Sequence, residues 1–313
     1  MKYFTKEWYD LMQRMNYTCG MKCIPDKEYT DAEIKALYDK KLKKEIAHNR
    51  KLHNTPVNME YLYDLLEPES FDPNHFLFMN EETGQYFHPE TPEIAKAHID
   101  EDCRRAREKF EQRPPFDPQE TIDFFAEVYH NLLRVAYSNL PEWAVPLLDK
   151  RLRALEYMPE SVYRQLRKEE QKNKRAFERI MKKAEADLGQ QAIPEKMREG
   201  FCFHDARLLS IKKAGTDVAL CLRKDGMWPE GTPYIRVIFK NVTLFEREKG
   251  LVIRKRMGQH GEWESNYVYL YDELYCTDTG YEIHILLTGK ELRYLTIGCE
   301  DVVFEDNIGP EEL

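Results

Sequence analysis

The most distinctive chemical pair in the chain is His204 and Asp205, inside the stretch FCFHDARLLSI at 201–211. Metal-dependent hydrolases use a His-Asp pair of this kind with further His and Asp ligands, and a protein metal site needs at least three convergent ligands. The later histidines, His260 and His284, are each isolated. We therefore interpret the pair as a turn at the start of a strand and expect no metal. A metal-dependent hydrolase centred on His204 and Asp205 is the alternative.

A second candidate is the Glu-x-x-His pattern formed by Glu127 and His130. Di-iron helical bundles use two such patterns together with two further glutamates, and this chain has one. The segment is predicted to be helical, and its apolar residues recur at helical spacing. We expect Glu127 and His130 to lie beside the core face of this helix, which the spacing assigns to Phe124, Val128, Leu132 and Val135.

The cysteines do not indicate a metal or disulfide framework. Cys19 and Cys23 lack a second pair at zinc-site spacing, and the seven cysteines are odd in number and scattered, as is typical of reduced thiols. The chain also lacks a phosphate-binding loop, a dinucleotide-binding glycine pattern, a His-Glu-x-x-His zinc motif and a nucleophile elbow. We therefore expect no cofactor and favour a non-enzymatic function.

A basic stripe is the clearest candidate for binding. Between residues 162 and 183 the chain has nine basic and three acidic side chains, a net charge of +6. Six of the basic residues fall on one face of a predicted helix, opposite an apolar face: Arg164, Lys168, Lys172, Arg175, Arg179 and Lys182. This stripe could bind nucleic acid phosphates, anionic lipid or an acidic partner, although it has no interleaved aromatic residues for base stacking. The alternative is a solvated face.

Aromatic residues in the C-terminal third are the last candidates. Tyr267, Tyr269 and Tyr271 recur at a spacing of two and are predicted to share one strand face. Trp228 and Trp263 lie near predicted loops. If they are exposed, these aromatic side chains would form a binding surface. The alternative is that they are buried against the helical half.

Composition narrows the class of protein. The 313 residues carry a net charge of −9, which disfavours nucleic acid and anionic membranes as partners of the whole molecule. No run of about 18 apolar residues is present, as a membrane helix requires. The N-terminal residues do not resemble a signal peptide. We expect a cytoplasmic protein with no membrane partner.

The period of the hydrophobic pattern changes once along the chain. Up to about Leu188 it is helical, with helix starts at Thr30, Thr91 and Asp117, interrupted by an acidic, Pro-rich loop at 67–91 with a small hairpin. From Arg207 it alternates with a period of two, over seven or eight short strands separated by turns such as Asp225-Gly226. Short strands without intervening helices predict an antiparallel sheet.

Several segments resemble a known family. The opening MKYFTKEWYD, the FHDARLLSI junction and the closing YEIHILLTGKELRYLTI are similar to a family of uncharacterised bacterial proteins, catalogued as domain of unknown function 4085. The resemblance covers nearly the whole chain and implies no activity. The C-terminal part, with its HDxxLxSI entry, is also similar to small immunity proteins of bacterial toxin–immunity loci.

Together these patterns predict an α+β protein. We expect a helical domain at 1–188, a linker at 189–200, an antiparallel β sandwich or partly open barrel at 201–306 and an acidic tail at 307–313. The favoured function is an interaction module that binds a protein partner, in an immunity or stress context. Nucleic-acid binding through the basic helix at 162–183 is an alternative.

Overall fold

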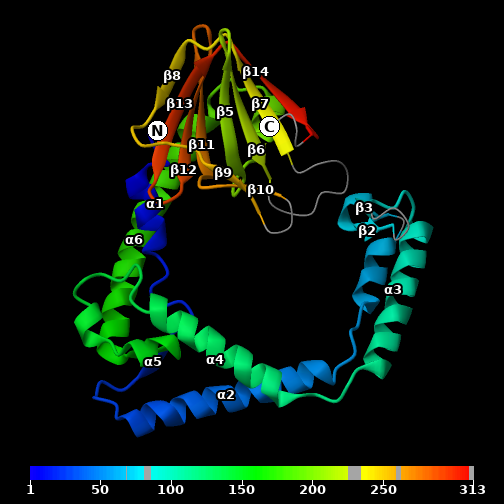
Figure 1. Ribbon diagram of the computed structural model, residues 1–313, viewed down its shortest axis with the longest axis vertical. Helices are drawn as coiled ribbons and strands as arrows, with labels where there is room; N and C mark the ends of the chain where they lie inside the picture. The colour runs from blue at the N-terminus through cyan, green and yellow to red at the C-terminus, as the bar shows by residue number, and fades with distance from the viewer. Residues whose placement is uncertain (68, 81–85, 225–233, 259–261, 310–313) are drawn as a thin grey trace. The chain divides into compact units, whose positions relative to one another are not determined.

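The computed structural model describes residues 1–67, 69–80, 86–224, 234–258 and 262–309, and it confirms the predicted α+β class. The chain forms two compact units: a helical unit, Arg14–Lys172, and a sheet unit, which joins Met1–Gln13 to Asn173–Leu313. The long helix α6, Glu160–Gly189, continues from the first unit into the second (Figure 1). The predicted turn Asp225-Gly226, Trp228 and His260 lie outside the described residues.

Local sequence signals explain where the helices of the helical unit begin. Thr30 and Glu33 form the predicted capping box of α2. Thr91 and Asp117 accept hydrogen bonds from the first turns of α3 and α4, and each is followed by proline. The bounds are α2 Asp31–His53, η1 Glu60–Leu66, η2 Pro73–His75, α3 Pro92–Gln112, α4 Pro118–Val135, η3 Val145–Leu147 and α5 Lys150–Ala154.

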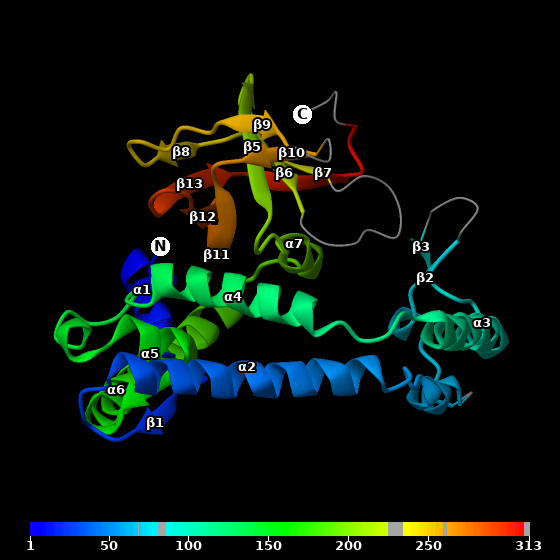
Figure 2. The same ribbon diagram turned by 60° about the horizontal axis from the view of Figure 1, so that its bottom comes forward.

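Two short strand pairs complete the helical unit. Strand β1, Lys22–Ile24, pairs in parallel with β4, Tyr157–Pro159. The predicted hairpin in the 67–91 loop is present: β2, Phe78–Met79, pairs antiparallel with β3, Tyr86–Phe87. Figure 2 shows α4 running beside α2, and the aromatic ring of Tyr38 on α2 makes edge contacts with Phe125 and Tyr129 on α4.

The sheet unit contains one eight-stranded antiparallel sheet of order β14-β7-β6-β5-β11-β12-β13-β8. The sheet is not closed, but side chains from both of its four-stranded halves pack into a common core, among them Leu220, Val237, Ile285 and Ile297. The bounds are β5 Arg207–Ala214, β6 Asp217–Arg223, β7 Tyr234–Lys240, β8 Leu244–Arg247, β11 Val268–Thr277, β12 Gly280–Thr288, β13 Arg293–Cys299 and β14 Asp301–Asp306. Strands β9, Lys255–Met257, and β10, Trp263–Ser265, form a separate pair.

The segment predicted as a linker packs against this sheet. Ile193 and Met197, the latter on α7 (Glu195–Gly200), are buried in its core. Ile308, in the predicted tail, is also buried, against Leu209 and Cys221. These contacts follow from the hydrophobic effect, because each apolar side chain adds to the buried apolar area of the sheet unit.

The N-terminal arm, residues 2–13, is held by a buried carboxylate. Glu273 on β11 is fully buried and accepts backbone N–H bonds from Lys2, Tyr3 and Phe4 at 2.6–2.7 Å. Burial alone would raise the pKa of Glu273, but these bonds and one from the Tyr275 hydroxyl lower it below its usual value. The arm continues into α1, Lys6–Gln13, where Trp8 is buried.

One prediction about the tyrosines is wrong. The register between β11 and β12 shifts between Tyr269 and Tyr271, so Leu270 forms a bulge. Tyr267 and Tyr269 are buried in the core, whereas Tyr271 contacts Phe4 and Trp8 of the N-terminal arm. A strict period of two cannot anticipate this, because an inserted residue moves every later side chain to the other face.

Asp272 gives the sheet unit a pH dependence. Burial raises the pKa of this half-buried carboxyl to about 7, an increase that interaction with the Tyr269 hydroxyl opposes. Because its pKa is raised on folding, stability from this group is full below the unfolded value and is lost as pH rises towards 7. We expect Asp272→Asn to be more stable than the parent above pH 7, by on the order of 2 kcal/mol, with no gain near pH 4. Urea denaturation at both pH values measures the difference; an equal difference at both would contradict it.

Candidate functional site

Helix α4 packs with the face next to the predicted one. Phe124, Val128, Leu132 and Val135, which the sequence assigned to the core, are exposed, with 65% of Phe124 and 54% of Val135 accessible to water. The helix buries Thr121 and packs Phe125 and Tyr129 against α2 instead. Because α4 has apolar residues on two adjacent faces, spacing alone could not decide which one is buried. The outcome is an exposed apolar stripe, Phe124-Val128-Leu132-Val135, hereafter the α4 stripe.

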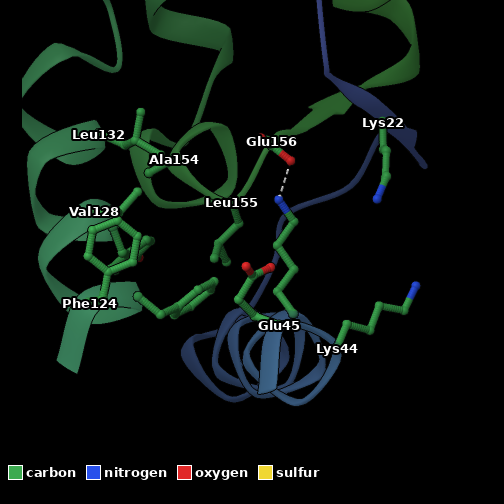
Figure 3. A pocket seen from close by; sticks show the side chains of 12 residues that line it. Lys22, Lys44, Glu45, Phe124, Val128, Leu132, Ala154, Leu155 and Glu156 are labelled. Carbon is green, nitrogen blue, oxygen red and sulfur yellow. Dashed lines mark hydrogen bonds and ion pairs between the residues drawn. The ribbon is translucent and has the colours of Figure 1, made fainter. Parts of the chain in front are cut away.

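Phe124, Val128 and Leu132 of the α4 stripe form one wall of a groove of about 340 Å³ in the helical unit. Figure 3 shows Phe124, Val128 and Leu132 on one side, Ala154 and Leu155 between, and Lys22 and Lys44 on the other. Phe125 and Tyr129, which also line the groove, join its apolar wall to the core of the unit. An exposed, continuous apolar surface rimmed by charged residues is typical of an interaction site.

Lysines dominate the charged rim of the groove. Lys41 on α2 forms an ion pair with Glu156, which Figure 3 marks with a dashed line. Lys22 and Lys44 are exposed, and the side chain of neither forms a hydrogen bond or ion pair with another described residue. With Glu45, the groove is lined by three lysines and two glutamates, a net charge of +1. The rim therefore favours an acidic ligand.

Glu156 is held at the rim by its backbone. It follows the short helix α5 with φ of 59°, a left-handed conformation that is unfavourable for a residue with a Cβ atom. Its carbonyl accepts the backbone N–H of Lys22 at 2.7 Å, which joins α5 to β1. The strained turn thus fixes two rim residues, Glu156 and Lys22, from segments far apart in the sequence.

His204 and Asp205 lie on an exposed turn before β5. Their side chains pair at 2.9 Å between Nδ1 and Oδ2, with 51% and 67% of each side chain exposed. Asp205 has φ of 69°, and its backbone N–H donates to the Tyr269 carbonyl. Among the described residues no three His, Cys, Asp or Glu side chains are arranged to hold a metal ion. The pair therefore has the geometry of a turn that starts the sheet.

The other predicted candidates remain apart from one another. His130 is exposed and bonds through Nδ1 to the Ala126 carbonyl, one turn back on its own helix, and Glu127 is exposed beside the α4 stripe. Cys19 and Cys23 are free and exposed. On β12, His284 pairs with Glu282, at 2.7 Å between Nε2 and Oε1.

The predicted basic stripe is exposed along α6. All six of its side chains face solvent, three in the helical unit and three in the sheet unit: Arg164, Lys168, Lys172, Arg175, Arg179 and Lys182. Arg164 pairs with Glu160, and Arg179 bonds to the Arg175 carbonyl. Nucleic-acid binding through this stripe stays a prediction.

Sequence reasoning missed the groove. Its rim and floor come from α2, β1 and the α5 turn, and no local motif marks Lys22, Lys44, Leu155 or Glu156. One signal was available: Phe125 and Tyr129 form a second apolar pair at spacing four, beside the α4 stripe. Two apolar faces on one helix predict that one face packs within the unit and that the other is covered by a partner.

The fold and groove define an α+β protein with a helical unit, an open antiparallel sheet and an exposed apolar surface. Within the part of the chain that the structure describes, no helix has the length and apolarity to cross a membrane. The chain belongs to the family described as protein of unknown function (DUF4085), whose model matches residues 119–298, more than half of the sequence. The matched region begins at α4 and ends in β13. No curated protein matches the chain.

Proposed function

We propose that this chain is a non-enzymatic protein-binding module and that the α4 stripe is its contact surface. The observation that carries the proposal is the exposure of Phe124, Val128, Leu132 and Val135 in one line on a helix whose next face packs Phe125 and Tyr129 against α2. Removing a large apolar side chain from water contributes about 1.5–3 kcal/mol, so the surface has a strong tendency to be covered.

The distribution of exposed apolar side chains supports the helical unit as the binding part. Among the described residues, most of the exposed large apolar side chains belong to this unit, whereas the sheet unit has Val252, Met257 and Val303. Isolated exposed apolar residues are ordinary, but four in register on one helix are not. The absence of nucleotide-binding and hydrolase motifs from the sequence agrees with a binding role.

A polar α4 stripe is expected to lose the partner. The variant Phe124→Ser/Val128→Ser/Leu132→Ser removes three apolar contacts, and we expect capture of a saturable protein partner from cells of the source organism to fall more than about 30-fold. Because Val128 and Leu132 are 37% and 38% exposed, their replacement also removes some packing, and we expect the unfolding free energy to fall by about 1–2 kcal/mol, which leaves the protein folded.

The matched control is Val252→Ser/Met257→Ser, which alters exposed apolar residues of the sheet unit. It should capture the partner as the parent does. Equal capture by the parent and the stripe variant, with the control unchanged, would place binding elsewhere and overturn the assignment of the α4 stripe.

A further inference from the structure

We infer that the occupant of the groove is an amphipathic helix of another protein, acidic along one flank. This inference rests on the proposed function and identifies the chemistry of its partner. The α4 stripe spans from Phe124 to Val135, about 16 Å or three helical turns. A helix of three to four turns therefore matches it in length.

The geometry of α4 favours a helix over an extended peptide. The stripe residues Phe124, Val128 and Leu132 recur every fourth position and form one ridge along the helix. Such ridges pack into the grooves between side chains of a second helix. An extended peptide gains affinity by pairing with a free strand edge, but the backbone groups of a helix interior are already paired within the helix. Helix-in-groove binding is the mode that α4 offers.

The charged residues around the stripe orient the partner. Lys22, Lys41 and Lys44 lie on the far side of the groove, and Lys22 and Lys44 are free to pair with incoming carboxylates. On the opposite side of the stripe, away from Phe125, α4 carries the exposed Asp123 and Glu127. Acidic side chains of the partner are attracted to the side with the lysines and repelled by the side with Asp123 and Glu127. The partner helix is thus acidic on one flank and neutral or basic on the other.

The test uses a labelled helical peptide of about 15 residues, titrated against the full-length protein by fluorescence anisotropy. The peptide has leucine at positions 1, 5, 8 and 12 and glutamate along one flank, and a second peptide replaces each glutamate with lysine. We expect the acidic peptide to bind and Lys22→Glu/Lys44→Glu to weaken binding roughly ten-fold. The same variant should bind the lysine peptide more tightly than the parent does.

The matched control is Lys40→Glu/Lys43→Glu, which makes the same charge change at exposed positions of α2 outside the groove. If both double variants weaken binding equally, the effect is one of overall charge and the acidic flank is overturned. If neither peptide binds while the α4 stripe variant still loses the natural partner, the helical occupant is wrong and the proposed function stands. If the parent is a dimer by light scattering and the stripe variant a monomer, a second copy occupies the groove and the inference fails.

Discussion

Glu273→Ala is expected to lower the unfolding free energy of the sheet unit by about 3–5 kcal/mol. The carboxylate has no exposed surface and receives three backbone N–H groups and the Tyr275 hydroxyl. Removing it leaves these donors without their acceptor, among them the buried N–H of Tyr3, and an unsatisfied buried donor costs about 1–3 kcal/mol. The loss is a large fraction of the stability of a typical domain.

The variant Glu273→Gln keeps the shape of the side chain but removes its charge, so it measures the contribution of the charge. The amide keeps one acceptor oxygen but places an NH₂ group against backbone donors, so we expect an intermediate loss of about 2 kcal/mol. Since the pKa of Glu273 is lowered on folding, its contribution is present above the unfolded pKa and is lost as pH falls through the folded value. The difference between the parent and Glu273→Gln should therefore shrink in acid, in urea denaturation followed at pH 7 and below pH 4.

Glu246 provides the control for both variants, because it lies in the same cross-strand row as Glu273, His284 and Thr296 but is exposed at the edge strand β8. Glu246→Gln should change the unfolding free energy by less than about 0.5 kcal/mol. A loss below 1 kcal/mol for Glu273→Ala would mean that the arm is not held by this carboxylate.

Glu170→Ala is the second large effect, with an expected loss of about 2–4 kcal/mol in the helical unit. Glu170 on α6 is 4% exposed and accepts both the backbone N–H of Thr18, at 2.6 Å, and its hydroxyl. Arg167 completes the site at 3.1 Å. Without the carboxylate, the backbone N–H and hydroxyl of Thr18 lose their acceptor on α6.

Hydrogen–deuterium exchange of the Thr18 amide measures this loss, because that N–H donates to Glu170. Glu127→Ala, which removes an exposed carboxylate from α4, should leave the exchange unchanged. Protection of Thr18 that survives in Glu170→Ala would show that other contacts hold the segment.

Local sequence signals predicted the helix starts and the small hairpin, because these features depend on residues that are close together in the sequence. The Thr30–Glu33 capping box, the Thr91-Pro92 start and the small hairpin near Phe78 were all readable in this way. The change of period near Arg207 predicted the antiparallel sheet. Each of these features requires only residues a few positions apart.

Features that depend on distant residues could not be predicted. Glu273 is a buried acid in a strand, and its role becomes visible only when Lys2–Phe4 lies over β11. The Tyr271 orientation depends on one bulged residue. The α4 stripe was identified as apolar but assigned to the wrong environment, since the competing face of Phe125 and Tyr129 packs against Tyr38. The groove could not be predicted either, because its apolar wall was assigned to the core and its charged rim comes from separate segments.

The most direct test of the binding surface is photo-crosslinking from the α4 stripe. A crosslinking phenylalanine analogue is placed at Val128, and at Val252 of the sheet unit as a control, in the full-length protein expressed in its source cells. We expect Val128 to yield one discrete crosslinked protein, attached through a helix with apolar residues three and four apart and acidic residues on one flank. Equal yields of the same products from Val128 and Val252, or attachment only to a second copy of this chain, would contradict the proposal.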